Sequence, residues 1–127
     1  MRRYIILIAL IFTMMQGAKI KILQTLSLDN IEFDGFNFSE ISGATYDKKN
    51  HILYLVSDKG ILFKFYAFFE DEVYLKKIGA YYLRKKSGKR LKSWKRDSEG
   101  IALDKKGNLY ISFEGKPTIA KFSKDGV

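Results

Sequence analysis

The chain has 127 residues, no cysteine and a formal net charge of +9, so we expect a single domain and exclude disulfide bonds and thiol chemistry. Hydrophobic residues make up 46% of the chain and aromatic residues 15%. This composition excludes an intrinsically disordered protein, because it supplies enough apolar side chains for a packed core.

The N-terminal segment is typical of a secretory signal peptide. A short basic stretch (residues 1–4) precedes an apolar run (residues 5–15), and Gln16-Gly17-Ala18 offers small residues for cleavage. The apolar run is shorter than an ordinary transmembrane helix. We predict a signal peptide at 1–18 and a periplasmic or secreted mature protein at 19–127, with no nucleic-acid partner and no stable membrane span after cleavage. An uncleaved N-terminal anchor is the alternative.

Alternation of apolar and polar residues, broken by Gly, Asp and Asn, predicts a succession of strands and no helix after the signal peptide. The predicted strands are residues 20–28, 41–46, 51–56, 61–69, 73–83, 99–103, 108–113 and 118–122. A turn is predicted at Asp34-Gly35, and residues 84–98 are predicted to form a basic connection between two groups of strands.

Residues 42–65 and 99–122 are similar in sequence. Gly43 aligns with Gly100 and Phe65 aligns with Phe122. A repeated strand-rich unit of this length predicts an all-β fold of β-propeller-type blades, with about two blade-like antiparallel sheets. Because a closed propeller needs roughly four to eight blades, we expect an incomplete propeller. Either the reading frame is truncated or a partner chain supplies the missing blades.

The chain resembles the phytase-like family, described as esterase-like activity of phytase, over residues 39–126. The residues that carry the resemblance are Ser42-Gly43-Ala44, Tyr46-Asp47, Leu53-Tyr54, Ser57-Asp58-Lys59-Gly60, Asp97-Ser98-Glu99-Gly100, Asn108-Leu109-Tyr110 and Glu114-Gly115. Lys59 departs from the arginine that is usual in the family. The resemblance implies the N-terminal part of a phytase-like propeller, acting on an ester or phosphate ester.

Five acidic residues are expected at one mouth of the structure. Glu40, Asp97 and Glu99 precede or open the first strand of a blade, whereas Asp58 and Glu114 follow the second strand. Clustered carboxylates suit Ca²⁺ or a hydroxyl-rich or cationic ligand. We predict ligand binding by all five residues and calcium binding by Glu99, Asp58 and Glu114. The alternative for Asp58 and Glu114 is that they are ordinary turn residues.

No catalytic nucleophile is identified in the sequence. The single histidine, His51, is predicted to be a solvated turn residue at the end opposite the acidic residues. Residues 84–96 hold eight basic side chains and Trp94, and could form a solvated loop or bind an anionic polymer or phosphate ester. The aromatic run between Phe63 and Phe69 is predicted to lie in the core and between blades.

The sequence therefore leaves two function classes open. The first is an exported phytase-like hydrolase of an ester or phosphate ester. The second is a non-catalytic propeller fragment that binds a small molecule or a protein partner at the acidic mouth.

Overall fold

The computed structural model describes residues 17–29 and 31–127, so most of the predicted signal peptide lies outside the described residues. Seven strands and one 3₁₀-helix form the regular structure of this part of the chain. They are β1 (Ile41–Asp47), β2 (Ile52–Ser57), β3 (Ile61–Phe69), β4 (Val73–Tyr82), η1 (Ser93–Arg96), β5 (Ser98–Leu103), β6 (Leu109–Phe113) and β7 (Thr118–Phe122).

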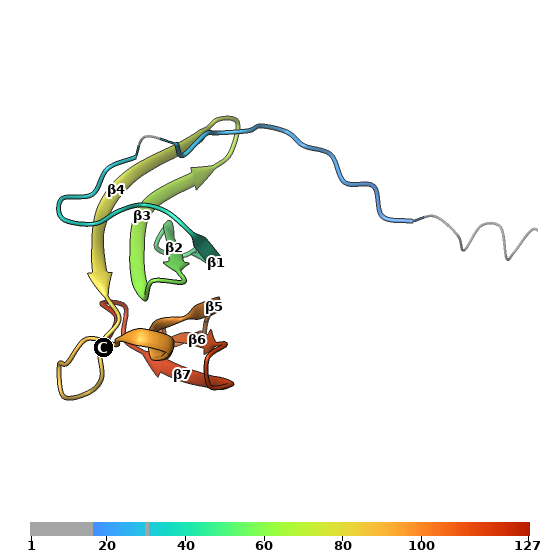
Figure 1. The fold of residues 1–127 in the computed structure, drawn as a ribbon. Helices are drawn as coiled ribbons and strands as arrows, with labels where there is room; N and C mark the ends of the chain where they lie inside the picture. The colour runs from blue at the N-terminus through green and yellow to red at the C-terminus, as the bar shows by residue number, and fades with distance from the viewer. Residues whose placement is uncertain (1–16, 30) are drawn as a thin grey trace, which may run out of the picture.

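The strands form two antiparallel sheets (Figure 1). The first sheet has the order β1-β2-β3-β4 and the second has the order β5-β6-β7, so neighbours in the chain are neighbours in each sheet. The prediction of an all-β chain with two blade-like sheets is confirmed. Within residues 17–29 and 31–127, no helix has the length and apolar character needed to cross a membrane.

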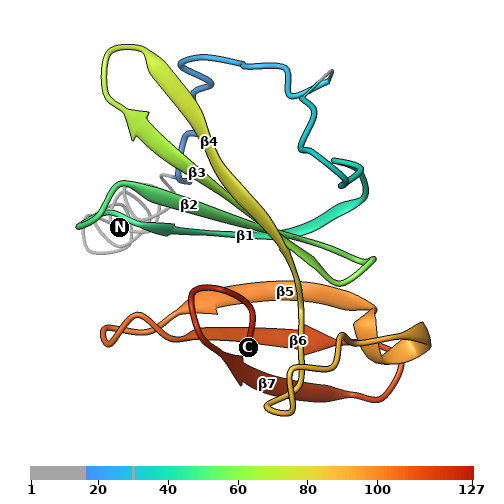
Figure 2. The same cartoon turned by 90° about the vertical axis from the view of Figure 1, so that its left-hand side faces the viewer.

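The two sheets are stacked with β1 and β5 next to each other (Figure 2). Equivalent glycines of the repeat permit this contact. A Cβ atom on Gly43 would lie 3.0 Å from the Cα atom of Gly100, closer than most side chains tolerate. The repeat in the sequence therefore marks the place where the inner strands of the two sheets touch.

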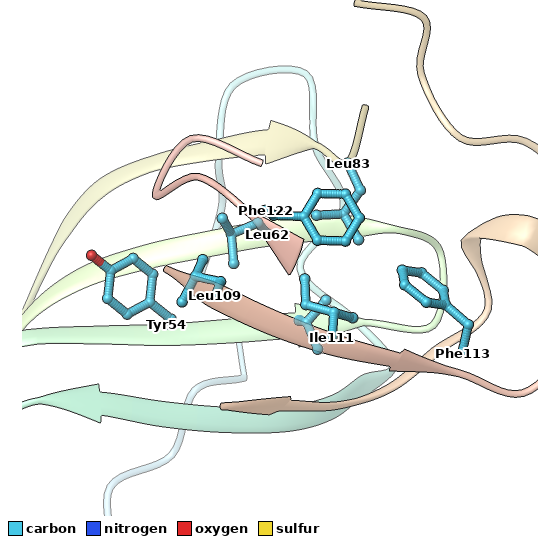
Figure 3. Packing of buried hydrophobic residues seen from close by; sticks show 8 residues of the cluster. Tyr54, Leu62, Leu83, Leu109, Ile111, Phe113 and Phe122 are labelled. Atoms are coloured by element: carbon cyan, nitrogen blue, oxygen red, sulfur yellow. The ribbon is translucent and has the colours of Figure 1, made fainter. Parts of the chain in front are cut away.

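One hydrophobic cluster fills the space between the sheets (Figure 3). It joins alternate residues of the first sheet to one face of the second, because side chains on a strand alternate between its two faces. Its buried members are Tyr54, Val56, Leu62, Leu83, Leu109, Ile111, Phe113 and Phe122.

The opposite face of the first sheet is covered by the loop that precedes β1. In a second cluster, Phe33 and Phe38 lie against Phe63, with ring centroids 5.1 and 4.9 Å away. The predicted turn at Asp34-Gly35 is present, since the N–H of Phe36 donates to the carbonyl of Phe33. This loop covers a face that would otherwise be exposed to water.

Two predictions about apolar segments are wrong in part or in full. Residues 20–28 form no strand, and almost all of them are exposed. In the aromatic run, Phe63 and Phe65 are buried against the loop, but Tyr66, Phe68 and Phe69 are between 38% and 49% exposed. Strand β3 extends beyond the residues that the loop covers, so its last aromatic rings face solvent.

The first half of the basic connection is held by two backbone hydrogen bonds. The N–H of Arg84 donates to the carbonyl of Gly126, and the N–H of Leu91 donates to the carbonyl of Leu83. Its last part forms η1, the four-residue 3₁₀-helix. Residues 84–90 and 92–95 are exposed, as expected of a solvated loop, whereas Leu91 packs against the buried cluster between the sheets.

Candidate functional site

The same backbone hydrogen bond brings acidic residues together in each sheet. The N–H of Asp58 donates to the carbonyl of Glu40 at 3.1 Å, and the N–H of Glu114 donates to the carbonyl of Asp97 at 3.0 Å. Each bond joins the residue before the first strand of a sheet to the residue after its second strand. We call these four residues and Glu99 the acidic mouth.

Glu99 is the extra residue of a β-bulge in the second sheet. Ser98 pairs with Phe113 and Gly100 pairs with Ser112, so Glu99 has no partner on β6. A bulge changes the direction of a side chain relative to the regular pleat, and bulges are common beside functional sites. The bulge explains how an exposed carboxylate on an inner strand comes to lie beside its acidic neighbours.

Three carboxylates of the acidic mouth lie close enough to share one ligand. One oxygen atom from each of Asp97, Glu99 and Glu114 lies within 4.8 Å of the other two. Asp58 is outside this group of three. Glu40 instead forms an ion pair with Lys59, whose Nζ lies 2.5 Å from the Glu40 Oε2 atom.

The pKa values of the acidic mouth depend on these neighbours. Partial removal of water raises the pKa of Glu99, and the negative charge of Glu114 raises it further. Partial removal of water and then the charge of Glu40 raise the pKa of Asp58. The hydrogen bond from Lys59 lowers the pKa of Glu40. The mouth therefore holds carboxylates whose mutual repulsion a cation would relieve.

Serine side chains that the sequence analysis did not identify connect the two sheets at this end. The hydroxyl of Ser98 donates to the carbonyl of Ser57 at 2.5 Å. The hydroxyl of Ser42 donates to the carbonyl of Ser98. Ser42 occupies the bulge of the first sheet that corresponds to the Glu99 bulge of the second. In the sequence, the only sign that the two bulges are equivalent is that Ser42 and Glu99 stand at the same position of the repeat.

A hollow of about 300 Å³ lies beside the three carboxylates and shares Asp97 with them. Its lining also includes the acidic residues Glu40 and Asp58 and the basic residues Lys59 and Arg96. Arg96 is packed against the turn after β2, where a Cβ atom on Gly60 would lie 2.7 Å from the Cβ of Arg96. The hollow thus combines fixed positive charge with a nearby group of carboxylates, a combination suited to an anionic ester and a cation.

His51 does not contribute to this site. It follows the β1–β2 turn, whereas Glu40 and Asp58 lie at the other end of the same two strands. Its Nδ1 atom lies 3.1 Å from the hydroxyl of Tyr46, and its ring stacks on Phe68 at a centroid distance of 4.6 Å. The prediction of a turn at the opposite end is confirmed, but the ring is packed against its neighbours and not fully solvated.

The spacing of the three carboxylates is compatible with calcium as a shared ligand. Calcium takes oxygen ligands at about 2.3–2.6 Å, so two ligand atoms on one ion lie at most about 5 Å apart. The separations among Asp97, Glu99 and Glu114 fall within that limit. Three carboxylates can provide up to about six oxygen atoms when each binds with both of its oxygens.

Comparison with known proteins gives one match. The family model of the phytase-like proteins, described as esterase-like activity of phytase, matches residues 37–127. No curated protein and no solved structure is significantly similar to the chain. The matched region includes both sheets, the acidic mouth and the connection between the sheets. Because the model covers more than half of the chain, this protein belongs to the phytase-like family.

Proposed function

We propose that the protein is an exported phytase-like hydrolase that binds calcium at Asp97, Glu99 and Glu114 and acts on an ester or phosphate ester in the adjoining hollow. The observation that supports this proposal is the juxtaposition of three carboxylates with a hollow lined by Lys59 and Arg96. The family membership supports the reaction class, and the predicted signal peptide supports a periplasmic or extracellular location.

Different residues of the site would bind the substrate, bind the cation and transfer protons. Arg96 would bind the anionic group of the ester through its planar guanidinium, which suits phosphate oxygens. Asp97, Glu99 and Glu114 would hold the cation beside that group. A bound calcium ion would supply positive charge next to the oxygen atoms of the scissile group. Asp58, with its raised pKa, would serve as a nearby proton donor or acceptor.

Hydrolysis of p-nitrophenyl phosphate and p-nitrophenyl acetate with and without Ca²⁺ tests the proposal. We expect calcium-dependent hydrolysis that is lost in Glu99→Gln. Arg96→Gln should raise the KM for the phosphate ester by about tenfold and change the neutral ester much less, because only the phosphate offers charged oxygens to the guanidinium. Lys92→Gln removes a charge from the same connection outside this hollow and serves as the control.

A non-catalytic binding module is the second candidate. It is favoured by the position of His51, the chain's only histidine, far along the strands from the acidic mouth. A partner chain or a small-molecule ligand would then bind at the mouth. If the protein binds calcium but hydrolyses neither ester, this second function replaces the first.

A further inference from the structure

A second hollow lies on the other side of η1 and has no part in the proposed function. It has a volume of about 380 Å³ and lies between the basic connection and strands β6 and β7. Small-molecule sites commonly have volumes of about 300–1,000 Å³. Among its lining residues, only Trp94 also lines the hollow beside the acidic mouth.

The floor of this second hollow is apolar. Phe113 and Phe122 belong to the buried cluster between the sheets, and Leu91 and Ala120 pack against that cluster. Figure 3 shows Phe113 at the opposite end of the cluster from Tyr54. The floor is thus the outer end of the hydrophobic core, and an apolar group placed on it would be removed from water.

The rim of the hollow is strongly basic. Its lining contains no acidic side chain, although Val127, the last residue of the sequence, also borders it. Six of its residues are basic: Arg84, Lys85, Lys86, Lys95, Lys116 and Lys121. Lys121 lies near Asp104, which offsets its charge, so the positive charge of the rim comes mainly from the other five residues. In the part of the chain that the structure describes, none of these five forms an ion pair. Their charges are therefore available to an anionic ligand.

Trp94 forms a fixed wall of the hollow. A Cβ atom on Gly115 would lie only 2.5 Å from the carbonyl oxygen of Trp94, so the β6–β7 turn packs directly against η1. The ammonium of Lys95 lies 5.3 Å from the centre of the indole ring, within the range of a cation–π interaction. Trp94 as a whole is 48% exposed, which leaves part of its surface for a ligand.

We propose that this hollow binds one small amphiphilic anion, such as the phosphate monoester of an apolar alcohol. The apolar body would lie on the floor formed by Leu91, Phe113 and Phe122, and the anionic head would meet the basic rim. Binding there would use the basic rim and the apolar floor, and would require neither calcium nor the acidic mouth. A single molecule is favoured over a lipid bilayer because the apolar surface is recessed and does not protrude.

Fluorescence of Trp94 provides a direct test, because it is the only tryptophan of the chain. The full-length chain is titrated with octyl phosphate below its micelle concentration, with octanol, and with inorganic phosphate. We expect octyl phosphate to shift the emission to the blue and to bind at least about tenfold more tightly than either of the other two. Burial of only two methylene groups corresponds to about a tenfold gain in affinity.

A charge-reversal pair locates the binding. Lys95→Glu with Lys116→Glu should weaken octyl phosphate binding by about tenfold or more. Lys48→Glu with Lys105→Glu makes the same change of net charge in the two exposed turns outside the hollow and should leave binding nearly unchanged. Far-ultraviolet circular dichroism confirms that both variants retain the strand signal.

Five outcomes would overturn the proposal. Equal affinity for octyl phosphate and octanol would remove the basic rim from the site, and equal affinity for octyl phosphate and inorganic phosphate would remove the apolar floor. Binding detected by calorimetry without a change in Trp94 emission, or weakened equally by both charge-reversal pairs, would place it elsewhere. Binding to phosphatidylglycerol vesicles without binding to octyl phosphate would indicate a membrane surface in place of a single molecule.

Discussion

Glu99 is the inserted residue of the bulge in β5, and this insertion positions its carboxylate for cation binding. The bulge between Ser98 and Gly100 turns its carboxylate toward Glu114, and the resulting repulsion raises the pKa of Glu99 after partial removal of water. A carboxylate that is less acidic in the folded protein than in the unfolded chain opposes folding once it is ionised. The ionised Glu99 side chain therefore lowers the stability of the folded protein at a potential binding site.

The first prediction concerns this cost. The pKa of Glu99 is raised in the folded protein. Its favourable contribution to the free energy of unfolding is therefore present at acid pH and is lost as the pH rises through the folded pKa. Glu99→Gln cannot ionise and should have a higher thermal unfolding midpoint than the wild type at pH 7 without calcium. The difference should vanish below about pH 4, where Glu99 in the wild type is protonated. A lower midpoint for the variant at pH 7 would contradict the predicted repulsion.

The second prediction concerns the buried amine of Lys64. This side chain is 10% exposed, and its Nζ atom lies 2.9 Å from Asp125 Oδ1, beyond the end of β7. Asp125→Asn should lower the free energy of unfolding by about 1–2 kcal/mol in urea, because a largely buried charge loses its partner. The exposed Asp71→Asn serves as the control and should change stability much less. Equal effects of the two substitutions would show that the ion pair adds nothing.

At the scale of elements, the close contact of β1 with β5 holds the two sheets together at the inner edge. The hydroxyls of Ser42 and Ser98 donate to backbone carbonyls there, and the glycines of the repeat let the strands approach. Neither strand can move away without exposing the cluster between the sheets.

The third prediction tests this contact. Gly43→Ala would place a methyl group about 3.0 Å from the backbone of Gly100, which should lower the free energy of unfolding by about 1–3 kcal/mol. Ala44→Ser changes the next residue of β1, whose side chain is exposed, and should be nearly neutral. A neutral Gly43→Ala would mean that the sheets separate at little cost.

Local signals in the sequence predicted most of the strands, and the structure shows why. The two Asp-Lys-Lys turns are fixed by short-range bonds, in which Asn50 and Asn108 donate side-chain N–H groups to Asp47 and Asp104 at 2.7 Å. Such Asx interactions depend only on residues close in the sequence. The limits of β3 and β7 were predicted correctly for the same reason.

Features that depend on distant residues were not predictable in this way. The segment at 20–28 has the alternation of a strand but lacks a partner. The loop around Phe33 covers the first sheet through contacts with β3 that no local pattern indicates. The bulge at Glu99 is also invisible in the sequence, so the acidic residues could be assigned to one mouth but the group of three could not be selected.

At the scale of the whole molecule, the two sheets differ in what covers their outer faces. By register, Tyr110 and Ile119 occupy the positions that Tyr54 and Leu62 hold in the first sheet. Tyr54 and Leu62 are fully buried between the sheets, whereas Tyr110 is 37% and Ile119 is 73% exposed. The outer face of the second sheet therefore repeats part of that interface, and we propose that a second copy of the chain binds there.

The fourth prediction follows from this exposed face. Ile119→Lys should reduce the self-association of the protein in sedimentation velocity experiments at high concentration, because it places a charge in the middle of the repeated interface. Lys121→Arg, on the same face, conserves the charge and serves as the control. A wild-type protein that stays monomeric at all concentrations would contradict the binding of a second copy to this face.

Calorimetric titration with Ca²⁺ tests the central claim most directly. The wild-type protein should bind one calcium ion with a measurable heat, and Glu99→Gln should bind at least about tenfold more weakly. Glu70→Gln, in the exposed β3–β4 turn, should bind like the wild type. Equal binding by the wild type and Glu99→Gln, or no binding by either, would contradict a calcium site at Asp97, Glu99 and Glu114.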